Sequence, residues 1–171
     1  MTSRELKYIQ GAEKEILNRY LSEHPVKLGH LARELGVAIK VSSLSTGVSG
    51  QIKREGDHYL IRVNRHEARE RQRFTIAHEL AHFFLHKSII DSTPDGIKDN
   101  VLYRSGEPER IEFEANRLAA DIVMPMELVE KALQEDFESV VTEATIEGLA
   151  ARFQVSKAAM EIRLSTFSAA A

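Results

Sequence analysis

Residues 78–82 read His-Glu-Leu-Ala-His, a pattern that can assemble a metal centre on one helix. Residues four positions apart lie one turn apart on the same helical face, so the imidazoles of His78 and His82 can reach one ion. Glu79 lies about 100° further round, close enough to hold a metal-bound water without being a ligand. Zinc lowers the pKa of such a water to about 7, and a carboxylate can take its proton during attack on a carbonyl. The pattern therefore indicates a hydrolytic zinc site.

An ordinary amphipathic helix with two surface histidines would give the same letters without any metal. The neighbouring residues disfavour that alternative, because apolar side chains recur on more than one side of the expected helix and would bury it. These are Phe74, Ala77, Leu80, Ala81 and Phe84. Two histidines and a glutamate within five residues of a buried helix need a reason, and a metal site provides one.

A catalytic zinc ion takes a third protein ligand and keeps one open position. The chain has seven histidines and no cysteine, so this ligand must be an imidazole or a carboxylate. His86 continues the four-residue step, but a rise of about 1.5 Å per residue puts it roughly 12 Å along the helix from His78. A straight helix cannot bring both rings to one ion. We therefore interpret His86 as a structural or rim residue.

A carboxylate from a helix expected over residues 109–123 is the better third ligand. Glu112 shares a face with Ala115 and Asn116, and the small alanine would let this helix approach the histidine helix closely. Glu114, about 200° away from Glu112 on the same helix, is the alternative, and either could instead be a surface carboxylate. Asn116 could hydrogen-bond the far nitrogen of a ligand histidine.

Hydrophobic periodicity predicts the elements that position these residues. It favours an α+β fold in which a small three-stranded sheet, antiparallel or mixed, packs on helices, with additional helices towards the C-terminus. The sequence predicts helices over 4–21, 28–35, 67–87, 109–123, 126–136 and 143–165, strands over 37–44 and within 51–64, and a loop over 88–108. We expect a hairpin around Gly56.

Composition limits the possible partners and compartment. The net charge of −3 argues against direct nucleic-acid binding driven by charge alone. Five arginines lie within residues 62–73, and twelve acidic residues lie within 107–147; these are either solvated faces or a polarised surface that helps select a partner. The N-terminus has no signal-peptide core, and no apolar run is long enough to span a membrane. We expect a cytoplasmic protein without membrane segments.

Two motifs give the chain a resemblance to a known family. Residues 73–86, Arg-Phe-Thr-Ile-Ala-His-Glu-Leu-Ala-His-Phe-Phe-Leu-His, resemble the core motif of the ImmA/IrrE zinc metallopeptidases. Residues 112–121, Glu-Phe-Glu-Ala-Asn-Arg-Leu-Ala-Ala-Asp, followed by Met124-Pro125, are similar to the second motif of that family. Residues 63–64 and 155–164 are also similar, so the resemblance covers about residues 25–165.

The resemblance implies a zincin-like, thermolysin-like core. It implies that His78 and His82 bind Zn²⁺, that Glu79 is the general base, and that a glutamate of the second motif, assigned here to Glu112, completes the site. Characterised members cleave a helix-turn-helix repressor in mobile-element or stress-response control. The expected function is therefore a zinc endopeptidase with such a protein as its substrate. The alternative is a non-catalytic helix-turn-helix or protein-binding regulator that retains a metal site.

The expected organisation is a single metallopeptidase domain over residues 1–171. Helices and the sheet occupy about 1–66, the zinc-binding helices about 67–125, and a helical part about 126–165. Many relatives carry a separate DNA-binding or sensing domain, for which this chain has no room, so we expect control from outside the chain. Residues 148–160 have helix-turn-helix spacing, but their charges favour a helical pair that packs on the core.

Two features of catalysis stay open at this level. An oxyanion-stabilising group is expected among Tyr103, Arg104, His58 and His66, each of which is otherwise an ordinary surface residue. An extended substrate can pair with an edge strand, and the strand over residues 59–64 is either that edge or an interior strand.

Overall fold

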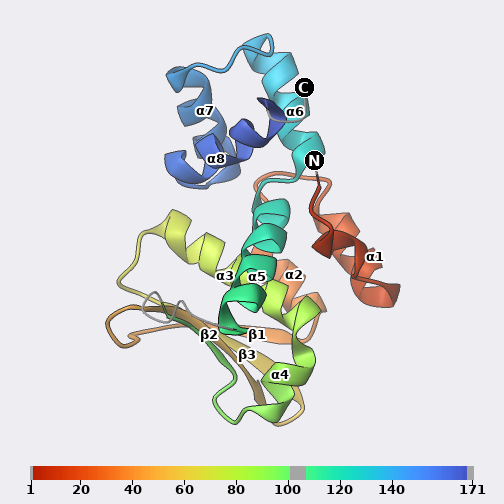
Figure 1. Cartoon of the computed structure of the whole chain (residues 1–171), viewed down its shortest axis with the longest axis vertical. Helices are drawn as coiled ribbons and strands as arrows, with labels where there is room; N and C mark the ends of the chain where they lie inside the picture. Colours follow the sequence, from red (N-terminus) through yellow and green to blue (C-terminus); the bar gives the residue numbers. More distant parts are fainter. Residues whose placement is uncertain (1, 101–106, 169–171) are drawn as a thin grey trace.

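Four strands form one mixed sheet in the computed structural model, which describes residues 2–100 and 107–168 (Figure 1). The strand order is β1-β3-β2-β4. β1 (Val37–Ser42) runs parallel to β3 (His58–Asn64), and β2 (Val48–Glu55) runs antiparallel to both β3 and β4 (Ile97–Asn100). The α+β class and the β2–β3 hairpin are confirmed.

The prediction of three strands is wrong, because β4 arises within the segment expected to be a loop. β4 has four residues, Ile-Lys-Asp-Asn, and Ile97 is its single apolar side chain. It is a strand because its backbone pairs with β2, from Val48↔Asn100 to Ile52↔Ile97. A helix, α4 (Lys87–Ser92), occupies the first part of the same segment.

β3 lies inside the sheet, between β1 and β2. Both of its backbone edges are therefore paired, and it cannot also accept an extended substrate strand. This excludes the edge-strand reading of residues 59–64. Among the described strands, the outer positions belong to β1 and β4.

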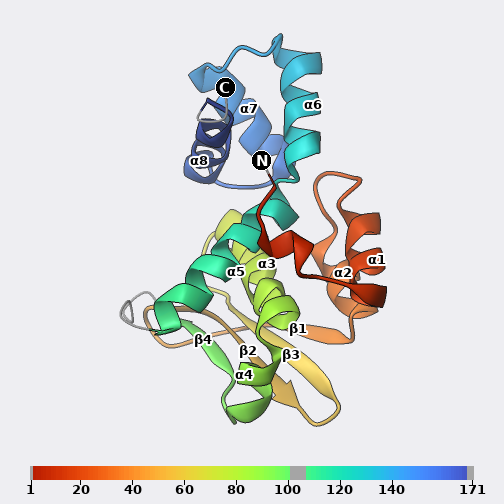
Figure 2. The same cartoon turned by 45° about the vertical axis from the view of Figure 1, so that its right-hand side comes forward.

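The helices that carry the metal motif cover one face of the sheet. Figure 2 shows α3 (Arg69–Leu85) and α5 (Glu107–Val123) side by side on this face, with α2 (Leu28–Glu34) next to them. Ile39, Ile61, Ile52 and Ile97 stand in register across the four strands. The two central isoleucines, Ile52 and Ile61, are fully buried and belong to the same core as Ala77, Leu80 and Ala81 of α3. This packing holds α3 in place against the sheet.

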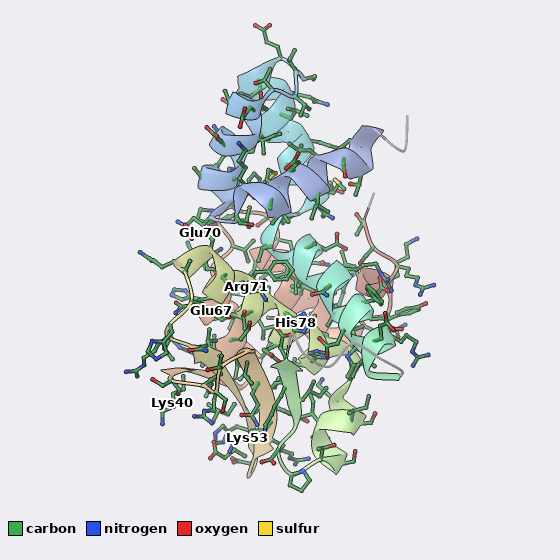
Figure 3. The ribbon with its side chains drawn as sticks, turned by 60° about the vertical axis from the view of Figure 1, so that its left-hand side comes forward. Lys40, Lys53, Glu67, Glu70, Arg71 and His78 are labelled. Carbon is green, nitrogen blue, oxygen red and sulfur yellow. The ribbon has the colours of Figure 1, made fainter. Side chains whose placement is uncertain are left out.

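The arginines of residues 62–73 do not form one patch. Arg62 pairs in register with Lys40 on the face of the sheet turned away from α3, the face on which Figure 3 shows Lys40 and Lys53. Arg73, in contrast, is half-buried and donates a hydrogen bond to the carbonyl oxygen of Val26 at 3.0 Å.

The N-terminal segment crosses over α5 before the first long helix. It contains the short helix η1 (Glu5–Lys7), followed by α1 (Gly11–Tyr20). Arg117 of α5 donates a hydrogen bond from Nε to Glu5 Oε1 at 3.0 Å, and the Glu5 side chain is buried. This ion pair attaches the segment to one of the two helices of the metal motif.

The last three helices, α6 (Met126–Phe137), α7 (Glu143–Phe153) and α8 (Lys157–Ser168), gather at the end of the molecule opposite the sheet (Figure 1). The single helix predicted over 143–165 is in fact two, because Gln154 adopts a left-handed conformation (φ 55°) and ends α7. Leu149, Phe153, Met160 and Leu164 are buried in the core. No helix in the described parts of the chain has the length and apolarity that a membrane crossing requires.

Candidate metal centre

The two histidines of the motif point from α3 towards one spot. His78 Nε2 and His82 Nε2 lie 3.1 Å apart, and both side chains are almost completely buried. The helical spacing of four residues places the rings on one face, and packing of α3 against α5 encloses them. The pair is thus not a solvated feature of a surface helix.

Glu112 of α5 meets both histidines. Its Oε2 lies 2.9 Å from His78 Nε2, and its Oε1 lies 3.2 Å from His82 Nε2. One ligand atom from each of the three residues falls within 4.8 Å of the others, close enough for a single metal ion. Ala115 and Ala119 are fully buried and permit the close approach of α5. The structure brings together the three residues expected as ligands and places Glu114 elsewhere.

The protonation states at this spot suit metal binding. Burial lowers the pKa of His82 to about 4, although the hydrogen bond with Glu112 opposes the shift. Burial raises the pKa of Glu112, but hydrogen bonds with His78 and His82 outweigh it and bring that pKa to about 2. At neutral pH the carboxylate is ionised and the His82 ring is neutral, and these are the forms that ligate a metal.

Glu79 lies in this centre with no hydrogen bond to its carboxylate. Its side chain is fully buried, and neither oxygen has a partner among the described residues. Burial raises the pKa of Glu79 well above the ordinary value, and the nearby carboxylates of Asp99 and Glu112 raise it further. A buried carboxylate without a partner is costly, so its presence beside the triad calls for a chemical reason.

Sequence analysis assigned no function to two residues that lie beside Glu79, Gly50 and Asp99. Gly50, one residue before the segment in which a strand was predicted, lies in β2, where a Cβ atom would be 2.9 Å from Glu79 Oε1. Asp99 of β4 stands opposite Gly50 in the register, and burial together with the neighbouring Glu112 raises its pKa. Asp99 gave no signal because its short polar strand could not be recognised from its own residues.

Each candidate ligand histidine has its second ring nitrogen engaged. Asn116 Oδ1 lies 2.9 Å from His78 Nδ1, the contact that the sequence led us to expect for this asparagine. His86 Nδ1 lies 2.9 Å from His82 Nδ1, and His86 Nε2 lies 2.9 Å from Glu114 Oε2. His86 is buried, so it is not the rim residue that one reading of the sequence allowed. The four-residue step from His82 to His86 is the sequence signal for this contact.

A polar cluster of Ser49, Glu67 and Arg71 joins β2 to the start of α3; Glu67 lies in the turn just before that helix. Figure 3 shows Arg71 and Glu67 near His78, on the side of the molecule facing the viewer. Ser49 donates a hydrogen bond to Glu67 Oε1 at 2.7 Å, and Arg71 Nη2 lies 3.4 Å from the Ser49 oxygen. Arg71 precedes His78 by two helical turns, which places its half-exposed guanidinium along the same face.

The two described candidates for oxyanion stabilisation, His58 and His66, make their contacts at exposed positions away from the triad. His58 is exposed at the β2–β3 hairpin and lies 3.3 Å from Asp57. His66 Nε2 lies 3.1 Å from Ser43 Oγ, also at an exposed position. Tyr103 and Arg104 lie outside the described residues.

The fold and site define a candidate His-His-Glu metal centre on two packed helices of an α+β protein. Residues 28–165 match the family model described as the IrrE N-terminal-like domain, Peptidase_M78. The chain belongs to this family, as the two motifs indicated.

Eleven chains of solved structures are similar to this one. One of them, titled "Mycobacterium tuberculosis transcriptional regulator", is 21% identical with a TM-score of 0.58. The match covers 94% of this chain and 48% of that one, so this chain spans about half the length of that protein. At this identity the likeness shows the fold alone. A search of curated proteins found no match.

Proposed function

We propose that this protein is a zinc-dependent endopeptidase. The observation that carries the proposal is the Glu79 carboxylate, which is buried beside the His78–His82–Glu112 triad and has no hydrogen-bond partner among the described residues. A purely structural metal site has no use for such a group, whereas hydrolysis needs a base next to the ion.

The residues present fit zinc. Two imidazoles and one carboxylate are a ligand set of catalytic zinc sites, which keep a further position open. When bound, the zinc would polarise the scissile carbonyl group and lower the pKa of a water molecule to about 7. The chain has no cysteine that could favour a thiolate site. Zinc is therefore the metal that we assign to the triad.

Glu79 performs the proton transfers in this proposal. A positive ion at the triad favours the ionised carboxylate, reversing the effect of burial on its pKa. One Glu79 oxygen takes a proton from the attacking water, and the carboxyl group then gives that proton to the leaving amine. The same side chain thus acts as base and then as acid, and Gly50 leaves the space in which it does so.

β4 is the strand that we assign to substrate pairing. It is an outer strand of the described sheet, and its Asp99 stands opposite Gly50, next to Glu79. An extended peptide that adds to β4 through backbone hydrogen bonds would run past the triad. The polar cluster of Ser49, Glu67 and Arg71 would then line the same approach.

The proposed substrate is a regulatory protein, specifically a helix-turn-helix repressor in mobile-element or stress-response control. Membership of the Peptidase_M78 family supports this assignment, since the resemblance of the two motifs to the ImmA/IrrE peptidases implies such a substrate. We propose that residues 1–171 work as one metallopeptidase domain in the cytoplasm.

Co-incubation with zinc and a helix-turn-helix repressor encoded beside this protein tests the proposal. Mass spectrometry should find two repressor fragments with the wild-type protein. Glu79→Gln should retain zinc and fold but cleave at least about 100-fold more slowly, because a positioned general base contributes about 10²–10⁴ in rate. Equal cleavage by Glu79→Gln would sink the hydrolytic mechanism.

The second candidate is a non-catalytic regulator that retains the metal site. The paired helices α7 and α8 favour it, since they have helix-turn-helix spacing. Their charges do not, because Lys157 at the start of α8 pairs with Glu143 and Glu147. Repressor binding without cleavage, unchanged in Glu79→Gln, would identify this second function.

A further inference from the structure

A chain of hydrogen bonds leads away from the candidate metal centre through two imidazole rings. It joins His82 Nδ1 to His86 Nδ1 at 2.9 Å and His86 Nε2 to Glu114 Oε2 at 2.9 Å. His82 is fully buried and His86 is 6% exposed, so water does not compete for either ring. The chain ends on a half-buried carboxylate.

The end of α3 creates this arrangement. α3 ends at Leu85, and the backbone of His86 leaves the helical conformation at φ −130° and ψ 29° while its N–H still bonds to the carbonyl oxygen of His82 at 2.8 Å. The departure turns the His86 ring back towards His82, with ring centroids 5.1 Å apart. His86 lies too far along the helix axis from His78 to be a ligand itself, but this turn lets it contact the ligand His82 directly.

Counting protons gives this chain one direction. A carboxylate only accepts hydrogen bonds, so His86 Nε2 donates to Glu114. His86 Nδ1 is then free to accept from His82 Nδ1. With zinc at the triad, His82 Nε2 would give its lone pair to the ion, so His82 would carry its proton on Nδ1. Without zinc, the Glu112 carboxylate 3.2 Å away competes for a proton on His82 Nε2.

We propose that Glu114 and His86 are positioning residues that hold His82 in its metal-binding tautomer. This inference rests on the proposed function only in placing zinc at the triad. The two ligand histidines then have unlike supports, since His78 bonds directly to the neutral amide of Asn116, whereas His82 reaches a carboxylate through a second imidazole. A hydrogen-bonded carboxylate makes the imidazole a stronger donor to the metal.

Zinc affinity is the first readout. Competition with a chromophoric chelator should give a zinc dissociation constant about 10-fold weaker for Glu114→Gln and up to about 100-fold weaker for His86→Leu, the range found for partners of ligand histidines. Adding Glu114→Gln to His86→Leu should cause no further loss, because the carboxylate acts through His86. Glu109→Gln, an exposed substitution of the same type on α5, is the matched control and should bind zinc like the wild type.

The hydrogen bond at His82 Nδ1 is the second readout, and a merely structural role for His86 would not change it. In the zinc-loaded wild-type protein, nitrogen-15 NMR of labelled histidine should find a His82 Nδ1–H that exchanges slowly with water, because His86 accepts its hydrogen bond. In zinc-loaded His86→Leu that proton should exchange faster, because its acceptor is gone. Should that variant fail to fold, Glu114→Gln and the wild-type spectrum still decide the question.

Wild-type zinc affinity in Glu114→Gln, or a fast-exchanging His82 Nδ1–H in the zinc-loaded wild-type protein, would overturn the inference. Neither measurement involves a peptide substrate. If the repressor is not cleaved, the zinc-affinity and NMR results still stand. If the hydrogen-bond chain from His82 to Glu114 proves to have no effect, the cleavage result still stands.

Discussion

Gly50 of β2 leaves the space that the Glu79 carboxylate occupies. A Cβ atom at position 50 would lie 2.9 Å from Glu79 Oε1 and 2.4 Å from Thr75 Cγ2, both closer than real Cβ contacts. A side chain here must therefore displace α3 residues at the metal centre. The missing side chain lets the sheet close over the base.

Gly50→Ala should thus impair catalysis while leaving the ligands in place. The added methyl group overpacks a filled site, which costs about 1–3 kcal/mol of unfolding free energy. Cleavage should fall because Glu79 is pushed from its position, and zinc stoichiometry should stay at one. Denaturant unfolding, zinc analysis and the repressor cleavage rate measure the three effects.

Gly29→Ala is the matched control for this substitution. Gly29 lies in α2, and a Cβ atom there would meet nothing within 4 Å. Alanine favours a helix over glycine by up to about 1 kcal/mol, so this variant should be as stable as the wild type or slightly more so. Wild-type cleavage by Gly50→Ala would contradict the role given to the close approach.

The candidate site could be predicted largely because its parts are local. His78, Glu79 and His82 share one helix, whose geometry follows from four-residue spacing. The small residues on the helical face of Glu112 indicate the third ligand. The contact of His86 with His82 could not be predicted in this way. It depends on the point at which α3 ends and on the backbone angles beyond it, whereas the spacing argument assumed a straight helix.

The strand arrangement was less predictable, because pairing is non-local. β3 is an interior strand because β1 pairs with it in parallel, although β2 lies between them in the sequence. β4 forms through backbone pairing with β2 and carries no alternating pattern. The helix-turn-helix spacing of residues 148–160 indicated a pair of helices there, but not the residue at which they separate. That residue is Gln154, whose left-handed conformation could not be predicted from its side chain.

Glu112→Ala and Glu114→Ala should separate the ligand from the positioning residue. Glu112→Ala removes a carboxylate that contacts both histidines, so the protein should lose bound zinc after dialysis. Glu114→Ala should bind one zinc ion per chain when zinc is saturating. Metal analysis of both variants decides between them, and the reverse pattern would make Glu114 the third ligand.

Glu5→Gln should lower stability in a pH-dependent way. Burial raises the pKa of Glu5, but hydrogen bonds from Arg117 and its neighbours outweigh it and bring that pKa to about 2, below the ordinary 4.5. The folded state therefore favours ionised Glu5. Its contribution is complete above about pH 4.5 and is lost as the pH falls towards 2. Since Arg117 is partly exposed, we expect a loss of about 2 kcal/mol at pH 7.

Urea unfolding of wild type and Glu5→Gln at pH 7 and pH 3 measures this difference, which should shrink at the lower pH. Glu70→Gln, at an exposed position on α3, should unfold like the wild type at both values. A difference that grows on acidification would show that the Glu5–Arg117 pair is not its source.

Arg163→Met should loosen the attachment of the C-terminal helices. Arg163 Nη2 lies 2.7 Å from Asp121 Oδ1, and both side chains are buried, so the α8 arginine neutralises a carboxylate of α5. Removing one partner of a buried pair costs about 3–5 kcal/mol, because the other charge stays behind without compensation.

Arg152→Met breaks the surface pair with Asp136 and should cost at most about 1 kcal/mol. Denaturant unfolding compares the two variants, and combining Arg163→Met with Asp121→Asn should recover part of the loss because no buried charge remains. Equal losses in Arg163→Met and Arg152→Met would mean that apolar packing alone holds α8 on α5.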